Sequence, residues 1–169
     1  MVSDQQLRND RLVYYSKDVE RLEGELDGFL ELSGARSALL IDCDGHLVTR
    51  RGEVDQGSLD SISALIAGSF AATREMARLL GEGQFSTLFH QGKRDSIQVS
   101  LVGDVALFAT VFDGRTNLGL VRYYAAETAL RLEGTLAEMK TRGPDEGGEG
   151  DQLSSDFQSS AVEALDKLF

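Results

Sequence analysis

The sequence is poor in the residue types on which many functional sites depend. It has one cysteine, Cys43, and two histidines, His46 and His90. One cysteine excludes an internal disulfide, and any metal site would need ligands of other types. No window approaches 18 uncharged apolar residues, so we expect no transmembrane helix. The polar first twenty residues have no signal-peptide core, and we therefore expect a cytoplasmic chain in a reducing environment.

Basic residues are scarce relative to acidic ones. The chain has 17 Lys and Arg against 28 Asp and Glu, a formal net charge of −11. Proteins that bind nucleic acid need clusters of Lys and Arg to displace counterions, so we expect no nucleic-acid partner. Residues 143–169 hold seven acidic residues and one basic residue, a net of −6, which leaves −5 for the first 142 residues. The pattern indicates a mildly acidic body with a strongly acidic tail.

The composition changes after Pro144, and together with the periodicity this predicts the domain boundaries. We expect an N-terminal extension over 1–15, one folded domain over 16–142, an acidic glycine-rich linker over 143–154 and a C-terminal amphipathic helix over 155–169. A helix of that length is marginal alone in water, so its apolar stripe predicts a docking surface. The stripe consists of Phe157, Ala161, Leu165, Leu168 and Phe169.

Hydrophobic periodicity predicts three helices in the body. They cover 16–32, 58–80 and a segment from Thr116 or Asn117 to about Lys140. Ser58 suits the start of the second helix and Gly81 its end. The intervening segments predict two strands and then three, in the order α-β-β-α-β-β-β-α. This order favours an α/β fold with a five-stranded antiparallel sheet and helices packed on it.

Two of the strands have distinct patterns. Residues 94–102 alternate between apolar and polar side chains, which predicts a strand with one face exposed to water. Residues 105–112 show no alternation and predict a central strand that is covered on both sides. Gly103-Asp104 between them suits a tight hairpin turn.

The segment Asp42-Cys43-Asp44-Gly45 resembles the nucleophile motif of haloacid-dehalogenase-type phosphatases. Such an enzyme also needs a Ser or Thr, a Lys and further acidic residues to hold phosphate and Mg²⁺ on a parallel sheet, and the sequence does not supply them in that arrangement. A calcium loop would need a third ligand position and a closing Glu. We therefore expect Asp and Gly to form a hairpin turn here, and Asp42 not to act as a nucleophile.

No other motif predicts catalysis. His46 and His90 fall in different predicted strands, and Gly92-Lys93 lacks the upstream Gly and the Ser or Thr of a phosphate-binding loop. We expect no catalytic residue, no metal site and no cofactor, and we expect a protein that is not an enzyme.

The helix over 58–80 has an unusual surface. One arc is apolar and is expected to face the sheet: Leu59, Ile62, Leu65, Ile66, Phe70, Ala72, Met76, Leu79 and Leu80. The opposite arc is small at its centre and charged at its flanks: Ala64, Ala67, Gly68, Ala71, Asp60, Arg74, Glu75 and Arg78. A glycine inside a helix costs about 1 kcal/mol relative to alanine. Small side chains let another backbone approach closely, so this arc predicts a dimer or partner interface; the alternative is an alanine-rich solvent surface.

Three segments resemble the roadblock/dynein-light-chain family, and within it the bacterial MglB type. They are "LIAGSFAATREMARLLGE" (65–82), "FHQGKRDSIQVSLVGD" (89–104) and "VFDGRTNLGLVR" (111–122). The resemblance covers residues 17–140 and, weakly, 155–169. It implies a profilin-like α/β/α sandwich that forms a homodimer through the central helices.

The resemblance also implies a partner, the Ras-like small GTPase MglA, whose GTP hydrolysis such dimers stimulate in bacterial polarity and gliding motility. They supply no arginine finger and instead reshape the GTPase so that its own residues align. A cell pole is the implied location, and other polarity proteins are further candidate partners. Arg74 and Glu75 stand where relatives often have small residues, which puts the geometry and choice of GTPase in doubt.

Two alternatives stay open from the sequence. The dimer could be a scaffold that binds a GTPase or polarity protein without accelerating hydrolysis. The tail could dock on the GTPase, on its own domain or on a different polarity protein. No membrane insertion is expected in either case.

Overall fold

The computed structural model describes residues 14–142, which form two compact units. The larger one, the sheet unit, spans 22–133, and the smaller one, the terminal unit, combines 14–21 with 134–142. The predicted order of elements is confirmed, with one added 3₁₀ turn. The helices are α2 (Ser16–Ser33), η1 (Gln56–Ser58), α3 (Leu59–Leu79) and α4 (Leu118–Arg142). The strands are β1 (Ser37–Asp42), β2 (Leu47–Gly52), β3 (Thr87–Gln91), β4 (Ser96–Val102) and β5 (Ala106–Phe112).

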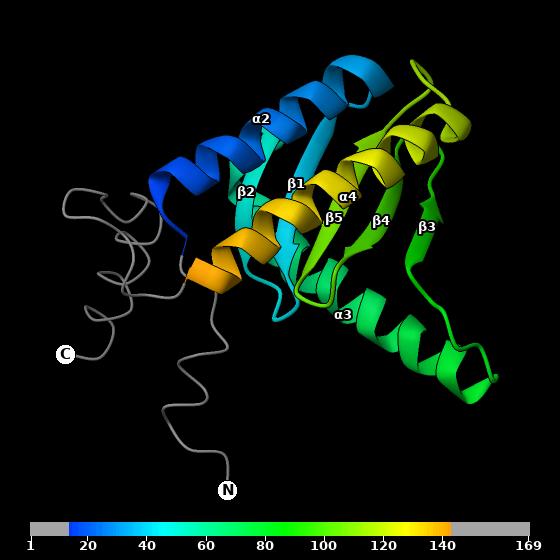
Figure 1. Ribbon diagram of the computed structural model, residues 1–169. Coiled ribbons are helices and arrows are strands. Elements are labelled where there is room, and N and C mark those ends of the chain that lie inside the picture. Colours follow the sequence, from blue (N-terminus) through cyan, green and yellow to red (C-terminus); the bar gives the residue numbers. More distant parts are fainter. Residues whose placement is uncertain (1–13, 143–169) are drawn as a thin grey trace, which may run out of the picture. The chain divides into compact units, whose positions relative to one another are not determined.

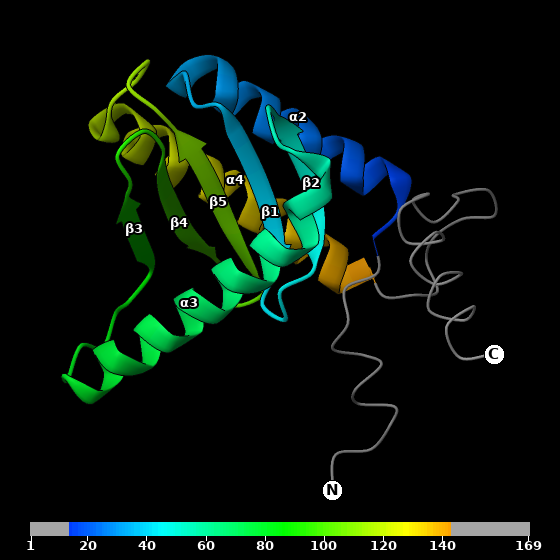
Figure 2. The ribbon, with the colours of Figure 1, turned by 180° about the vertical axis from the view of Figure 1, so that it is seen from behind.

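The five strands form one antiparallel sheet in the order β2-β1-β5-β4-β3. Strand β5 is central and almost wholly buried, as its lack of alternation predicts. Helix α3 covers one face of the sheet, and α2 and α4 lie on the other (Figures 1 and 2). The predicted sandwich of helices around a five-stranded sheet is therefore confirmed.

Each face of the sheet has its own core. The core under α3 is mainly aliphatic, with Phe70 as its buried ring. Its buried members are Leu39, Ile41, Leu59, Ile66, Ala67, Phe70, Val99, Leu107 and Ala109. On the opposite face, Phe29 of α2 meets Phe108 of β5 edge to face at 5.0 Å between ring centroids. Edge-to-face pairs of this kind add to the stabilisation from burial alone.

Strand β4 differs from the prediction. Its polar face is not exposed to water, because α4 lies over that side of the sheet (Figure 1). Gln98 is only 2% exposed and Ser100 is also buried. The Gln98 backbone oxygen accepts a hydrogen bond from the Thr110 hydroxyl at 3.4 Å. The alternation of apolar and polar residues in β4 therefore marks a row of polar side chains on a sheet face that is covered by a helix.

The ends of α3 are set by different residues from those expected. Ser58 occupies the position before the helix but makes no capping hydrogen bond with its side chain. The side chain of Asp55 instead accepts a bond from the amide of Gly57 and caps the 3₁₀ turn that leads into α3. Gly81 ends the helix as predicted, with a φ of +82° that favours glycine.

The terminal unit is held by ion pairs between the start of α2 and the end of α4. Asp18, 2% exposed, receives a hydrogen bond from Arg142 at 2.8 Å. Arg21 pairs with Glu138 at 2.8 Å on the surface. These contacts fix the last helical turn before the acidic linker.

Apart from Tyr14 and Tyr15, the predicted N-terminal extension, the linker and the tail helix lie outside the described residues, and so do all five tail-docking residues. Within residues 14–142, no helix is long and apolar enough to cross a membrane.

Candidate functional site: an exposed face of helix α3

The Asp42-Cys43-Asp44-Gly45 motif forms the turn between β1 and β2. The Asp42 carboxylate accepts hydrogen bonds from the backbone amides of Asp44 at 3.0 Å and His46 at 2.8 Å. Gly45 has a φ of +94°, which favours glycine. The Asp42 side chain thus stabilises the turn, as the sequence predicts.

The two histidines are not brought together. His46 precedes β2 at one edge of the sheet, and His90 lies on β3 at the other edge. The ligand atoms of Asp42, Asp44 and His46 do lie within 4.8 Å of one another. However, both Asp42 oxygens already bond within the turn, one of them to His46 Nδ1 at 3.2 Å. The hydrogen bonds of the turn account for this cluster.

The buried face of α3 is rotated from the predicted one. Its buried residues are Leu59, Ser63, Ile66, Ala67 and Phe70. The prediction that Ala67 lies on the interface side is therefore wrong. Ala67 is only 7% exposed and packs in the core under α3. The other predicted interface residues are exposed: Ala64, Gly68, Ala71, Arg74, Glu75 and Arg78.

The small size of Ala64 and Ala67 is explained by a contact within the chain. The β1–β2 turn lies directly on α3, where a Cβ added to Gly45 would stand 3.0 Å from the Ala64 Cα and 3.5 Å from the Ala67 Cβ. Larger side chains at these positions would push the turn away from the helix. Their small size therefore does not by itself indicate a partner.

The main difference from prediction concerns the large apolar residues of α3. Leu65, Met76, Leu79 and Leu80 were expected to face the sheet, but they are 56 to 87% exposed. Ala72 is exposed as well. No α3 residue beyond Phe70 is buried, because the C-terminal part of the helix projects past the strands (Figure 2).

The exposed apolar residues form a continuous row, which we call the outer stripe. It consists of Leu65, Gly68, Ala72, Met76 and Leu79, spaced three or four residues apart and so on one side of the helix. A Cβ added to Gly68 would meet no atom within 4 Å. No contact within the described part of the chain, 14–142, therefore compensates the cost of this glycine.

The combination of sizes in the outer stripe suits packing against another helix. Gly68 and Ala72 lie at its centre and leave room for a close backbone, while the larger side chains stand at both ends. Contiguous exposed apolar surface of this kind is typical of interaction sites. Sequence periodicity missed the outer stripe because exposed and buried apolar residues of α3 share the same apolar character.

The charged residues beside the outer stripe differ in their pairing. Arg78 binds Glu75 through two nitrogens, the shorter contact being 2.6 Å. This hydrogen bonding lowers the pKa of Glu75, so the carboxylate stays ionised. Arg74 forms no ion pair with any residue of the described range. Its guanidinium is thus the cation of this face that remains open to a partner.

Comparisons with known proteins were consistent with this geometry. The Roadblock/LC7 domain profile matches residues 22–112. No curated protein matches the sequence. Among solved structures, the gliding protein MglB from Thermus thermophilus is 35% identical, with a TM-score of 0.70 over 75% of this chain and 96% of that chain.

Two further structures agree. An MglB with a tetrameric arrangement is 35% identical, with a TM-score of 0.71 over 76% of this chain and 96% of that one. Myxococcus xanthus MglB is 30% identical, with a TM-score of 0.70 over the same shares. The chain therefore belongs to the roadblock/LC7 family and is of the MglB type.

Proposed function

We propose that the protein is a homodimeric regulator that binds a Ras-like small GTPase of the MglA type and stimulates its GTP hydrolysis. The observation that carries the proposal is the outer stripe of α3, an exposed apolar row on a chain of the MglB type. Two such stripes can pack against each other around Gly68 and Ala72. The paired helices then present Arg74, Glu75 and Arg78 of both copies at the edges of one platform.

Self-association through α3 has a physical reason. Beyond Phe70 the helix buries no residue against residues 14–142, and a short helical segment is marginal in water without tertiary contacts. Burying a leucine or methionine side chain stabilises by about 1.5–3 kcal/mol. A second copy would therefore supply the packing that the sheet does not.

In this proposal the protein contributes surface rather than a catalytic group. Arg74 is the α3 cation without an ion-pair partner in residues 14–142, and Arg78 is held by Glu75. An arginine that entered a GTPase active site from the α3 face would come from this pair. We propose instead that the platform shifts the GTPase switch segments until the GTPase's own residues align with the attacking water.

The test is phosphate release from a GTP-loaded MglA-type GTPase with and without the full chain. The proposal expects faster release, retained at saturating concentrations of Arg74→Ala and lost in a variant whose outer stripe is blocked by Gly68→Arg. Loss of the stimulation in Arg74→Ala alone would indicate an arginine finger. Binding without acceleration would favour a scaffold that carries the GTPase or another polarity protein.

The relatives support a proposal for the biological setting. The Thermus thermophilus relative is described as a gliding protein. We propose a role in bacterial polarity and gliding motility, in the cytoplasm and at a cell pole. The acidic tail, with Phe157, Leu165 and Phe169, would contact the bound GTPase away from the platform.

A further inference from the structure

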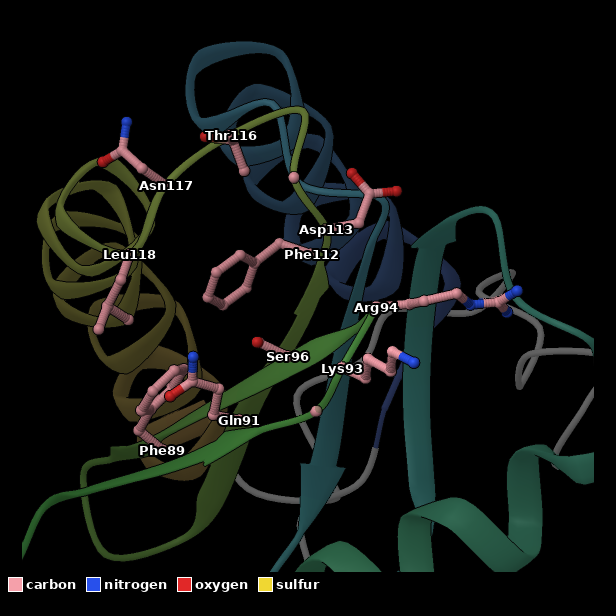
Figure 3. A pocket seen from close by; sticks show the side chains of 12 residues that line it. Phe89, Gln91, Lys93, Arg94, Ser96, Phe112, Asp113, Thr116, Asn117 and Leu118 are labelled. Atoms are coloured by element: carbon pink, nitrogen blue, oxygen red, sulfur yellow. The ribbon is translucent and has the colours of Figure 1, made fainter.

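A second candidate site lies on the face of the sheet opposite α3. It is a hollow of about 320 Å³ between the β3–β4 turn and the loop that joins β5 to α4 (Figure 3). The outer stripe and the hollow use different elements. A partner in the hollow would therefore leave the α3 platform free, and this inference does not depend on the proposed function.

The floor of the hollow is aromatic. Phe89 of β3 and Phe112 of β5 are stacked with their ring centroids 6.2 Å apart and their planes inclined by 20°. Figure 3 shows Leu118 beside the two rings, with the Gln91 amide and the Ser96 hydroxyl close by. Apolar walls with a few polar groups are typical of binding pockets.

The size of the hollow suits an aromatic side chain. A cavity of about 150 Å³ is enough to hold a benzene ring, so a phenyl group would fit with room for the backbone that carries it. Rings in an offset or inclined stack also attract one another beyond their area of contact. An inserted phenylalanine would thus extend the Phe89–Phe112 stack.

Two cations lie on the rim of the hollow and a third lies over one of its rings. Arg122 of α4 lies over the Phe89 ring, with its guanidinium carbon 5.7 Å from the ring centroid. Lys93 and Arg94 leave the β3–β4 turn at the rim and point away from the rings (Figure 3). Among residues 14–142, none of the three forms an ion pair, on a chain whose net charge is −11.

The acidic residue that lines the hollow, Asp113, is held in ion pairs. Both oxygens of Asp113 accept hydrogen bonds from Arg115, at 3.0 and 3.1 Å, and Arg36 lies 3.8 Å away. Hydrogen bonding from Arg115 lowers the pKa of Asp113. Arg36 and Arg115 also pair with Asp95 and Glu53. Lys93 and Arg94 are therefore the rim cations without an acidic partner in residues 14–142, and they can attract a negatively charged segment.

We propose that this hollow binds an acidic peptide segment of a partner protein. The segment inserts one aromatic side chain over Phe89 and Phe112, and its Asp and Glu residues run past Lys93 and Arg94 on the rim. Because Lys93 and Arg94 point away from the rings, they contact the flanks of the peptide rather than the inserted ring.

The test is a titration of the ¹⁵N-labelled full chain with blocked peptides, followed by amide chemical shifts. The probe has a central phenylalanine flanked on each side by two glutamates. We expect shifts at Phe89, Gln91 and Leu118 at millimolar peptide. A peptide with alanine in place of the phenylalanine, and one with lysines in place of the glutamates, should leave these amides unchanged.

The role of the rim cations is tested with substitutions at exposed positions, which should preserve folding. Lys93→Glu together with Arg94→Glu should lower the affinity for the peptide by about three- to tenfold or more, as expected for the loss of exposed ion pairs. The matched control Lys140→Glu, an exposed cation outside the hollow, should leave the affinity unchanged. Raising the salt concentration should lower the affinity of the natural chain for the peptide and have little effect on the affinity of the double variant.

Four results would overturn the inference. They are no shift at the hollow, equal shifts with the alanine peptide, unchanged affinity in the double variant, and equal shifts on adding vesicles of phosphatidylserine. The last result would assign the cations to an anionic membrane surface instead of a peptide.

Discussion

Gly45 of the β1–β2 turn rests on Ala64 of α3 so closely that a Cβ at position 45 would stand 3.0 Å from the Ala64 Cα. The neighbouring atom belongs to a helix backbone and cannot move aside cheaply. Gly45 also has a φ of +94°, a conformation that other residues rarely adopt. The hairpin and the helix are therefore fixed to each other by the absence of a side chain.

The first prediction concerns this contact. Gly45→Ala should lower the free energy of unfolding by about 1–3 kcal/mol, because it adds backbone strain and a steric clash. Gly24→Ala is the matched control, since a Cβ there would meet no atom within 4 Å. It should raise the free energy of unfolding by roughly 0.5–1 kcal/mol through helix propensity. Urea unfolding compares the two, and equal effects would contradict the packing of the turn on α3.

The second prediction concerns Asp18 in the terminal unit. Its side chain is 2% exposed, and one carboxylate oxygen has no hydrogen-bond partner among residues 14–142. Arg142→Ala should therefore leave a buried charge and lower the free energy of unfolding by about 3 kcal/mol. Arg21→Ala removes an exposed pair with Glu138 and should cost less than about 1 kcal/mol.

A rescue experiment distinguishes charge from packing in the same pair. Adding Asp18→Asn to Arg142→Ala removes the uncompensated charge and should recover part of the lost stability. If the double variant is no more stable than Arg142→Ala, the buried carboxylate is not the cause.

The third prediction concerns the reactivity of Cys43. Cys43 is exposed, but neighbouring atoms displace part of the water around its thiol. This desolvation, followed by the charges of Asp42 and Asp44, raises the pKa of the thiol. A raised pKa means a smaller thiolate fraction at any given pH, and only the thiolate is alkylated. The rate of reaction with iodoacetamide should therefore rise at a higher pH than the rate of a cysteine in an unstructured peptide.

Two variants should move the Cys43 profile in opposite directions. Asp44→Asn removes a repelling charge and should shift the profile to lower pH. Arg74→Ala removes a cation that favours the thiolate and should shift it to higher pH. Identical profiles for both variants would show that desolvation alone sets the reactivity.

The fourth prediction concerns self-association. Gly68→Arg places a long charged side chain at the centre of the outer stripe and should give a folded monomer, measured by sedimentation equilibrium. Leu130→Arg on α4 replaces a side chain of similar exposure to Leu79 and should leave the mass unchanged. An unchanged mass in Gly68→Arg would show that the outer stripe is ordinary surface. Ala67→Arg should unfold the protein instead, because Ala67 is buried.

The order of elements could be read from the sequence because local signals agree with the fold. Gly81 and Gly103 both adopt a positive φ where the sequence predicts a helix end and a turn. The apolar run of β5 likewise marks the centre of the sheet. Patterns of this kind depend only on residues near one another in the chain.

The orientation of α3 could not be read in the same way. Leu65, Met76 and Leu79 have the same apolar character as Ile66 and Phe70, yet they lie outside the buried face. When a helix has apolar residues on two sides, its sequence periodicity predicts one apolar face that lies between them. That predicted face matches neither the buried side nor the exposed apolar side. The buried Gln98 was missed for a related reason, because a polar side chain indicates water unless the covering helix is known.

The hollow could not be predicted at all. Phe89, Phe112 and Leu118 come from three elements, and only the sheet register brings the first two rings together. Sequence patterns describe single elements and contain no information on such convergence.

The most direct test of the central claim is single-turnover GTP hydrolysis by an MglA-type GTPase, titrated with the full chain. We predict a rate that rises to a plateau at two chains per GTPase, since a dimer would form one platform. The Gly68→Arg variant should give no rise at any concentration. A rate unaffected by the natural chain, although the GTPase binds to it, would contradict the proposed stimulation and leave a binding role alone.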